Sequence, residues 1–107
     1  MAVRPNVYRH VVLFKFKPSA SPATVAAIEA AFRDLCAGLD FVKDFEWGRN
    51  SSPEGLDRGF THCFLVTFDG PDARDAYLPH PAHVAFCRTW LDEHLEAACV
   101  VDFAAND

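Results

Sequence analysis

The sequence has no excess of positive charge and no run of basic residues. Ten Lys and Arg residues stand against fifteen Asp and Glu residues, so the formal net charge is -5 at pH 7. A surface that binds the phosphate backbone of nucleic acid needs clustered Lys and Arg side chains. We therefore expect no nucleic-acid partner.

Long apolar stretches are also missing. No segment approaches the roughly 18 apolar residues that a membrane-spanning helix needs, and residues 1–6 lack the apolar core of a secretion signal. The sequence therefore predicts a cytoplasmic protein that has no membrane partner.

The four cysteines form no closely spaced pair. Cys36, Cys63, Cys87 and Cys99 are far apart in sequence, and each lies among apolar residues of a predicted helix or strand. A C-x-x-C pair, which is typical of zinc and redox sites, is absent. We interpret all four as reduced, buried thiols, although the spacing leaves a disulfide between two of them open.

What the sequence does contain fits one globular domain. Of its 107 residues half are hydrophobic, ten are phenylalanine and 23% are charged, which is an ordinary balance for a folded protein. A chain of this length buries enough apolar surface for one core. We find no repeat or linker, and we assign residues 8–103 to the domain, residues 1–7 to an N-terminal extension and residues 104–107 to a tail.

The periodicity of the apolar residues defines seven elements. Ser21 and Pro22 are typical of the start of a helix, and Gly38 is typical of its end. The order of the elements is that of a ferredoxin-like α+β fold, in which a four-stranded antiparallel sheet carries its helices on one face. Strands are predicted at residues 8–17, 42–49, 60–68 and 97–103, and helices at residues 22–38, 72–78 and 81–95.

The segment from Tyr77 to His83 holds the densest group of reactive side chains. Proline favours the first helical position, so Pro81 should begin a helix with His80 at its cap and His83 in its first turn. The positive end of the helix dipole disfavours a charged imidazole. His83 is therefore a candidate general base, and we expect Tyr77 to form a hydrogen bond with it and to polarise a carbonyl group.

Alternation along the two central strands places His10 and His62 on the face that the helices cover. We therefore predict an apolar pocket between helices and sheet in which both histidines meet Tyr77 and His83, the two candidate catalytic residues. A structural role in a packed core is the alternative for each histidine. The candidate binding residues are His10, Val12, Phe14, Phe32, His62, Phe64, His80, Phe86 and Trp90.

His80, His83 and Cys87 have a spacing that metal ligands can share on one helix face. No carboxylate lies beside them in sequence to complete a ligand set, and most Asp and Glu residues fall on the outer faces of the predicted helices. We therefore predict neither a metal nor another cofactor.

The other side of the predicted sheet is unusually apolar for a surface that faces water. Val11, Leu13, Cys63, Leu65 and Val100 are expected there. A second copy of the chain is the simplest cover for such a patch. We therefore predict a homodimer formed through this face.

Six short motifs occur along the chain. They are HVVLFKFK at 10–17, WGRN at 47–50, SPEGL at 52–56, GFTH at 59–62, YLPHPAHVAF at 77–86 and VDF at 101–103. Together and in this order they resemble the stress-responsive A/B barrel domain family over residues 8–103. The resemblance implies a dimeric α+β barrel, in which two ferredoxin-like units meet through their sheets.

This family includes a plant polyketide cyclase, which the chain resembles around Tyr77 and His83. In that branch the aligned tyrosine and histidine are catalytic, and the histidine is the base of an intramolecular aldol condensation. Phe32 replaces a tyrosine of that branch, and Phe14 and Phe64 replace smaller aliphatic residues, so the pocket wall is bulkier here. The chain keeps three further histidines of that branch, His10, His62 and His80.

Two functions follow from these observations. The first is an enzyme that acts without a cofactor, as a cyclase, isomerase or lyase, on a small carbonyl or polyketide-like substrate. The alternative is a non-catalytic, stress-related or ligand-binding homodimer whose histidines are structural.

Overall fold

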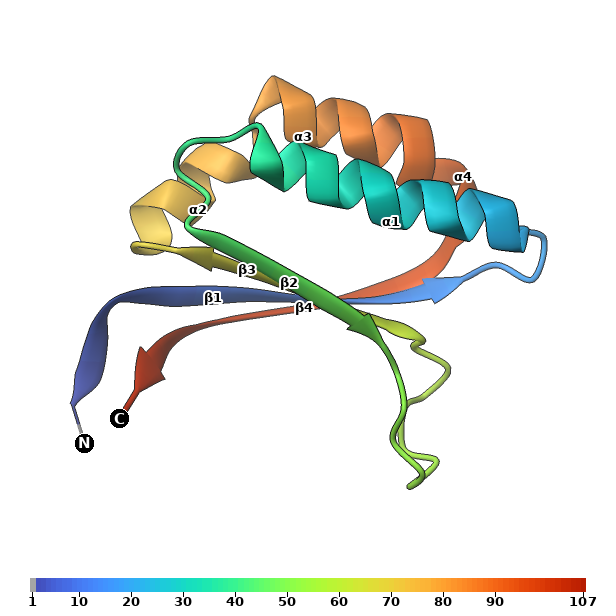
Figure 1. The fold of residues 1–107 in the computed structure, drawn as a ribbon, viewed down its shortest axis with the longest axis horizontal. Coiled ribbons are helices and arrows are strands. Elements are labelled where there is room, and N and C mark those ends of the chain that lie inside the picture. Colours follow the sequence, from blue (N-terminus) through green and yellow to red (C-terminus); the bar gives the residue numbers. More distant parts are fainter. Residues whose placement is uncertain (1) are drawn as a thin grey trace.

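The computed structural model describes residues 2–107 and shows one four-stranded antiparallel sheet with helices on one face (Figure 1). The strand order is β2-β3-β1-β4. The predicted ferredoxin-like α+β fold is therefore confirmed, with the first and third strands at the centre. The strands are β1 (Val3–Phe16), β2 (Asp44–Arg49), β3 (His62–Phe68) and β4 (Leu95–Asn106). The helical elements are α1 (Pro22–Ala37), α2 (Pro71–Tyr77), α3 (Pro81–Phe86), the π-helix η1 (Cys87–Leu91) and α4 (Asp92–His94).

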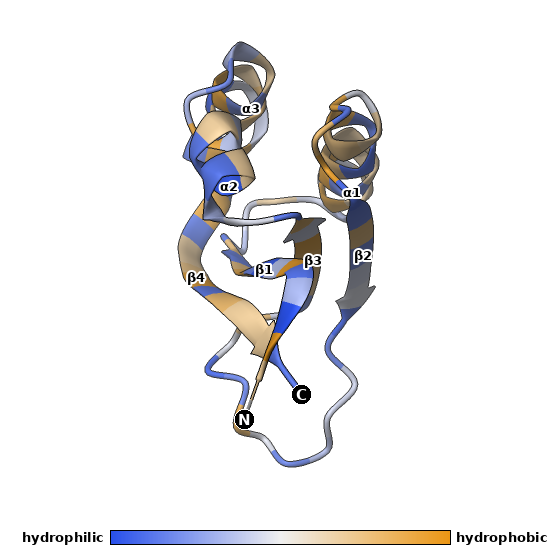
Figure 2. Ribbon diagram, turned by 90° about the vertical axis from the view of Figure 1, so that its left-hand side faces the viewer, coloured by the Kyte–Doolittle hydropathy of each residue, from blue (hydrophilic) through white to orange (hydrophobic). Residues whose placement is uncertain are grey.

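Figure 2 shows the two layers from the side, with α1 above β2 and with α2 and α3 above β4. Phenylalanine rings fill the space between the layers. Phe14 and Phe64 of the central strands have ring centroids 4.9 Å apart, and Phe32 of α1 stacks on Phe64 at 4.6 Å. All three side chains are buried. These aromatic contacts hold α1 over the centre of the sheet.

The local signals predicted for α1 are confirmed. The hydroxyl oxygen of Ser21 accepts a hydrogen bond from the backbone N–H of Thr24 at 3.1 Å, Pro22 begins the helix, and Gly38 follows its last residue. This start directs Ile28 into the core. No helix within residues 2–107 is long and apolar enough to cross a membrane.

The β1–β4 ladder is longer than predicted at the ends of the chain. β1 begins at Val3 rather than at residue 8, and β4 extends to Asn106 rather than to residue 103. Val3 pairs with Asn106, so most of the segments expected as an extension and a tail belong to these strands. In Figure 1 this end of the ladder and the loop at residues 50–61 both bend away from the helices. The uncovered face of the sheet thus lies between two projecting segments.

The helical path predicted at residues 81–95 is present but not uniform. α3 passes into the five-residue π-helix η1 at Cys87, and α4 completes the path. A π-turn holds one residue more than an α-turn, and such turns are frequent at functional sites. Two residues of η1, Cys87 and Leu91, line the cavity described below.

The register of β4 corrects one prediction. Val12 pairs with Val100, and Val11 pairs with Val101. Residues that oppose each other in a ladder point to the same face of the sheet. Val100 therefore lies on the helix-covered side with Val12, and its predicted place on the opposite face is wrong. Alternation alone defines two faces of a strand, whereas only the register decides which of them meets the helices.

We call the uncovered side of the sheet the open face. Val101 and Phe103 expose 57% and 44% of their surface, and no element within residues 2–107 covers them. Such a continuous apolar surface is typical of an interaction site. The open face consists of Val11, Leu13, Cys63, Leu65, Cys99, Val101 and Phe103.

Candidate functional site

A cavity of about 270 Å³ lies between the sheet and the helical layer. Strands β1 and β4 contribute one wall, and α1, α2, α3 and η1 contribute the others. The lining is mainly apolar, with a few polar groups. Seven predicted pocket residues line it, namely His10, Val12, Phe14, Phe32, Tyr77, His83 and Phe86. The structure adds Leu78, Cys87, Leu91, Ala98, Val100 and Asp102.

Four predicted pocket residues do not line this cavity. Phe64 is fully buried in the aromatic core, and Trp90 is half-buried at the edge of that core. His80 caps α3, because its Nδ1 accepts a hydrogen bond from the backbone N–H of Ala82 at 3.1 Å. His62 belongs to a separate polar cluster. The cap at His80 agrees with the prediction from Pro81. Of the four polar groups predicted to meet in the pocket, only His10, Tyr77 and His83 line the cavity.

His83 keeps an unprotonated ring nitrogen on the cavity wall. Its Nδ1 lies 2.8 Å from the carbonyl oxygen of Leu78. A carbonyl oxygen only accepts, so Nδ1–H donates and Nε2 of the neutral ring keeps its lone pair. Burial lowers the pKa of His83; the hydrogen bond to Leu78 opposes this shift, and the nearby rings of His10 and His80 add to it. His83 is thus a neutral base at pH 7.

Tyr77 is fully buried, and within residues 2–107 its hydroxyl group has no nitrogen or oxygen partner. The thiol of Cys36 is its neighbour, but a thiol is only a weak hydrogen-bond partner. The rings of Tyr77 and His83 touch, with centroids 4.4 Å apart and an interplanar angle of 42°. The hydrogen bond that we predicted between them is therefore wrong. Burial raises the pKa of Tyr77, and the thiols of Cys36 and Cys87 add to the shift. The hydroxyl group thus stays protonated and can donate to a ligand.

Asp102, which sequence reasoning missed, orients His10. The Nδ1–H of His10 donates to Oδ1 of Asp102 at 2.6 Å. The two residues are direct partners in the β1–β4 ladder, so the sheet itself sets their contact. The signal in the sequence was an acidic residue in the last predicted strand, but only the register shows which residue it faces.

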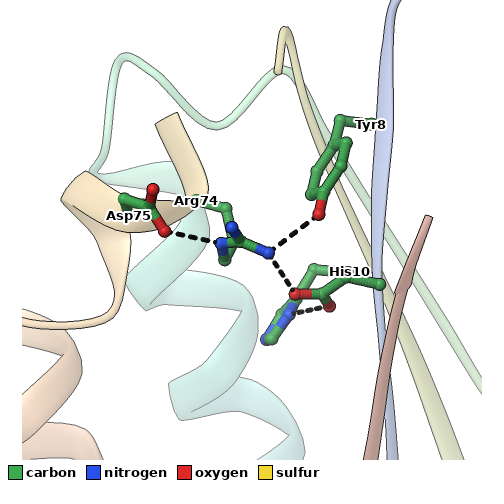
Figure 3. Close-up of polar contacts among 5 residues, drawn as sticks. Tyr8, His10, Arg74 and Asp75 are labelled. Carbon is green, nitrogen blue, oxygen red and sulfur yellow. Dashed lines mark hydrogen bonds and ion pairs between the residues drawn. The ribbon is translucent and has the colours of Figure 1, made fainter. Parts of the chain in front are cut away.

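Arg74 completes this network from the helical layer, as Figure 3 shows. Its guanidinium group donates to Asp102 at 2.9 Å and to the Tyr8 hydroxyl oxygen at 2.8 Å, and it also binds Asp75 at 2.8 Å. The hydrogen bonds to Asp102 and Asp75 raise the pKa of Arg74 further above its ordinary value. A permanent positive charge therefore compensates the carboxylate of Asp102, and α2 is tied to β1 and β4.

His62 lies in a second polar cluster with Glu29 and Arg49. Its Nε2–H donates to the Glu29 carboxylate at 2.7 Å, and Arg49 binds the same carboxylate through Nε at 2.9 Å and Nη2 at 3.0 Å. Glu29 is only 7% exposed, unlike the outward acidic residues that we expected on the helices. It follows Val25 by four residues, so it shares the inner face of α1, and this spacing was the missed signal.

Within residues 2–107 no three His, Cys, Asp or Glu side chains are arranged to hold a metal ion. His80 is engaged in its cap, whereas Nε2 of His83 lies 3.6 Å from Sγ of Cys87. All four cysteines are free thiols. Cys36 is buried as predicted, but Cys87 and Cys99 are only half-buried, and Cys63 is exposed on the open face because the sheet lacks a covering layer there.

The chain matches the family model described as the stress responsive A/B barrel domain over residues 8–105. It is 30% identical to olivetolic acid cyclase from Cannabis sativa over 78 residues, which cover 73% of this chain and 77% of the cyclase.

Solved structures share the fold. The crystal structure of the protein At3g17210 from Arabidopsis thaliana superposes with a TM-score of 0.87 and 33% identity, covering 94% of this chain and 96% of that one. A dimeric ferredoxin-like protein of unknown function from Thermobifida fusca superposes with a TM-score of 0.76 and 26% identity, covering 97% and 95%. These likenesses extend over nearly the whole chain.

Proposed function

The chain belongs to the stress-responsive A/B barrel domain family, and we propose that it is a homodimer whose cavity performs cofactor-independent chemistry on a small carbonyl compound. One observation carries this proposal. The cavity is lined by His83, whose Nε2 is unprotonated, and by Tyr77, whose buried hydroxyl group makes no hydrogen bond to nitrogen or oxygen. A base and a hydrogen-bond donor at one apolar site are the groups that enolisation needs.

In the proposed reaction His83 removes a proton from the carbon next to a carbonyl group. Tyr77 donates a hydrogen bond to the carbonyl oxygen as negative charge develops there, which stabilises the enolate. In cyclisation the enolate carbon attacks a second carbonyl group of the same molecule, and the imidazolium of His83 gives its proton to the alkoxide oxygen that forms. In isomerisation or lyase chemistry the proton on His83 returns to a different atom of the substrate or to the leaving group. The imidazole is regenerated on each path, so no cofactor is consumed.

His10 supports this chemistry from the opposite wall. Its ring lies 5.8 Å from that of Tyr77 between centroids, and the bond to Asp102 fixes its orientation. Arg74 compensates the charge of Asp102. The carboxylate can therefore orient His10 without placing an uncompensated negative charge beside the developing enolate. We assign His10 a positioning role and His83 the role of base.

The walls favour a small substrate. The volume of about 270 Å³ is slightly below the range of about 300–1,000 Å³ that is usual for ligand pockets. Phe14, Phe32 and Phe86 contribute aromatic rings to the wall, and Leu91 and Val100 contribute aliphatic groups. A short carbonyl compound is therefore the proposed substrate class.

The test is the exchange of α-protons, because this step precedes every reaction in the proposed class. The protein is incubated with acetylacetone in D₂O, and loss of the α-proton signal is followed by NMR. His83→Ala and Tyr77→Phe should each slow the protein-dependent exchange by about 10²–10⁴-fold. His94→Ala is the matched control, because this imidazole lies outside the cavity lining. Unchanged exchange in both cavity variants would contradict the proposal.

The second candidate is a binding protein without catalysis. It is favoured by the apolar lining, which suits a ligand whether or not the ligand reacts. Olivetolic acid cyclase, a cyclase by name, favours the enzyme. A small ketone that raises the melting temperature but shows no protein-dependent exchange would establish the binding function.

The homodimer is part of the proposal and is formed through the open face. Val101 and Phe103 leave about half of their surface exposed there, which a second sheet would cover. The strand ends and the loop at residues 50–61 project on the same side and would flank the partner (Figure 1). The dimeric relative from Thermobifida fusca supports this arrangement. We further propose the cytoplasm as its location, where thiols remain reduced.

A further inference from the structure

Cys87 and His83 form a thiol–imidazole pair on the cavity wall. They lie one helical turn apart, and Sγ of Cys87 is 3.6 Å from Nε2 of His83. Both residues line the cavity that also contains Tyr77. The enolisation chemistry proposed above uses His83 and Tyr77 but leaves Cys87 without a role.

The direction of the contact follows from the other side of the imidazole ring. Nδ1–H of His83 donates to the carbonyl oxygen of Leu78, so Nε2 of the neutral ring can only accept. The thiol of Cys87 is therefore the donor, and its proton already points at a base. A nucleophile, a base and a third group that orients the base are the three parts of an activated thiol.

The other thiols of the chain lack this arrangement. Within residues 2–107 no histidine ring nitrogen makes a hydrogen bond with Cys36, Cys63 or Cys99. Cys36 is buried in the core, and Cys63 and Cys99 lie on the open face, away from the cavity. Cys87 alone among them combines a base with access to an internal cavity.

Tyr77 is an independent sign that this cavity takes a ligand with a hydrogen-bond acceptor. Its hydroxyl group is fully buried and unpaired, although a buried donor without a partner is costly. Cys87 and Tyr77 line the same cavity. A ligand attacked by Cys87 would therefore have a hydrogen-bond donor available for its carbonyl oxygen.

We propose that Cys87 is a nucleophile that adds reversibly to small α,β-unsaturated carbonyl compounds, with His83 as its base and Tyr77 as the donor to the carbonyl oxygen. This inference rests on the proposed function of the cavity as a carbonyl site, and it narrows the substrate class to compounds with a conjugated double bond.

The step is balanced without an oxidant or reductant. The thiol proton moves to Nε2 of His83 as a sulfur lone pair forms a bond to the β-carbon. The electron pair of the C=C bond shifts to give an enolate, whose oxygen accepts a hydrogen bond from Tyr77. The imidazolium of His83 then returns the proton to the α-carbon. The product is a thioether, and the reverse steps release the compound.

The protonation of Cys87 and His83 before the reaction agrees with this order of steps. Burial, followed by the charge of Asp92, raises the pKa of Cys87, while burial lowers the pKa of His83. Thiol and imidazole are therefore both uncharged at pH 7, and the proton moves only when an electrophile is attacked. Such a thiol depends on its base, unlike a preformed thiolate.

The test uses the full chain and the probe 2-cyclohexen-1-one. Limited reaction at pH 7 is followed by intact-mass measurement and peptide mapping. We expect a single adduct on Cys87 ahead of the other three cysteines, and loss of this order in urea. Cyclohexanone, which has the same ring without the double bond, should leave no adduct. First modification at Cys63 or Cys99, or equal modification of all four, would overturn the proposal.

His83→Gln tests the role of the base. The amide keeps a polar side chain beside Cys87 but cannot take the thiol proton, so adduct formation on Cys87 should slow at least about tenfold. Equal rates of adduct formation in the wild type and in His83→Gln would show that His83 takes no part in the step. The α-proton exchange of acetylacetone is measured on the same sample. Exchange without a Cys87 adduct overturns this inference alone, whereas a Cys87 adduct without exchange overturns the proposed enolisation alone.

Discussion

Asp102 accepts the Nδ1–H of His10 at 2.6 Å across the β1–β4 ladder. Because both residues stand on paired strands, the imidazole is oriented by the sheet and not by a loop. Arg74 reaches the same carboxylate from α2 at 2.9 Å. The carboxylate therefore orients a ring of the cavity and also joins the two layers of the fold.

Asp102→Ala should lower the free energy of unfolding by about 2 kcal/mol, because it leaves the partly buried groups of His10 and Arg74 without their shared acceptor. Urea unfolding followed by circular dichroism measures this loss. Asp75→Ala is the control, since Asp75 also binds Arg74 but is 63% exposed. Its effect should stay below about 0.5 kcal/mol. Equal losses in the two variants would show that the bond to His10 contributes nothing.

Tyr77→Phe should make the protein more stable while it slows α-proton exchange. The substitution removes a buried hydroxyl group that has no partner, and we expect a gain of about 1 kcal/mol. Tyr8→Phe is the matched change, because the Tyr8 hydroxyl oxygen accepts a hydrogen bond from Arg74. That variant should lose about 1 kcal/mol. Thermal unfolding of both proteins decides the matter, and a destabilised Tyr77→Phe protein would mean that the hydroxyl group is satisfied.

His83 should make the protein less stable in mild acid. Its pKa in the folded protein lies below the ordinary value of 6.5, so the unfolded chain binds the proton more readily. Its contribution is complete above pH 6.5 and is lost as the pH falls through the lower folded value. The stability of the wild type minus that of His83→Gln should therefore decrease below pH 6.5. Denaturant unfolding across this range tests the sign, and an increase would refute it.

Val101→Asp should convert the proposed dimer into a monomer, because it places a charge in the centre of an apolar interface. Val100→Asp is a closely matched control. The two valines are neighbours with 57% and 54% of their surface exposed, but Val100 faces the cavity side. Sedimentation velocity at micromolar concentration should show a monomer for Val101→Asp and a dimer for Val100→Asp. A monomeric wild type, or a dimer that survives Val101→Asp, would exclude the open face as the interface.

Most of the architecture could be predicted because local signals determine it. Ser21 and Pro22 specify the start of α1, and Pro81 specifies the start of α3 with His80 as its cap. These signals act within a few residues, so no knowledge of the packing is needed. The parity of β1 likewise placed His10 under the helices, as the structure confirms.

The parts that could not be predicted depend on contacts between distant elements. His62 was expected beside Tyr77, but it binds Glu29 of α1 instead. This contact depends on how α1 is rotated over β3, which the sequence of neither element determines by itself. Val100 was placed on the wrong face because only the ladder defines the parity of β4. The bond between His10 and Asp102 depends on the same register.

The π-helix η1 has a consequence for how the length of this chain can vary. Its turn holds one residue beyond the α-helical repeat, so a shortening by one residue between Cys87 and Leu91 can be absorbed by conversion to a regular α-helix. β4 would keep its pairing with β1, whereas the side chains that η1 turns toward the cavity would change. Loss of a single residue here would thus reshape the cavity and spare the scaffold.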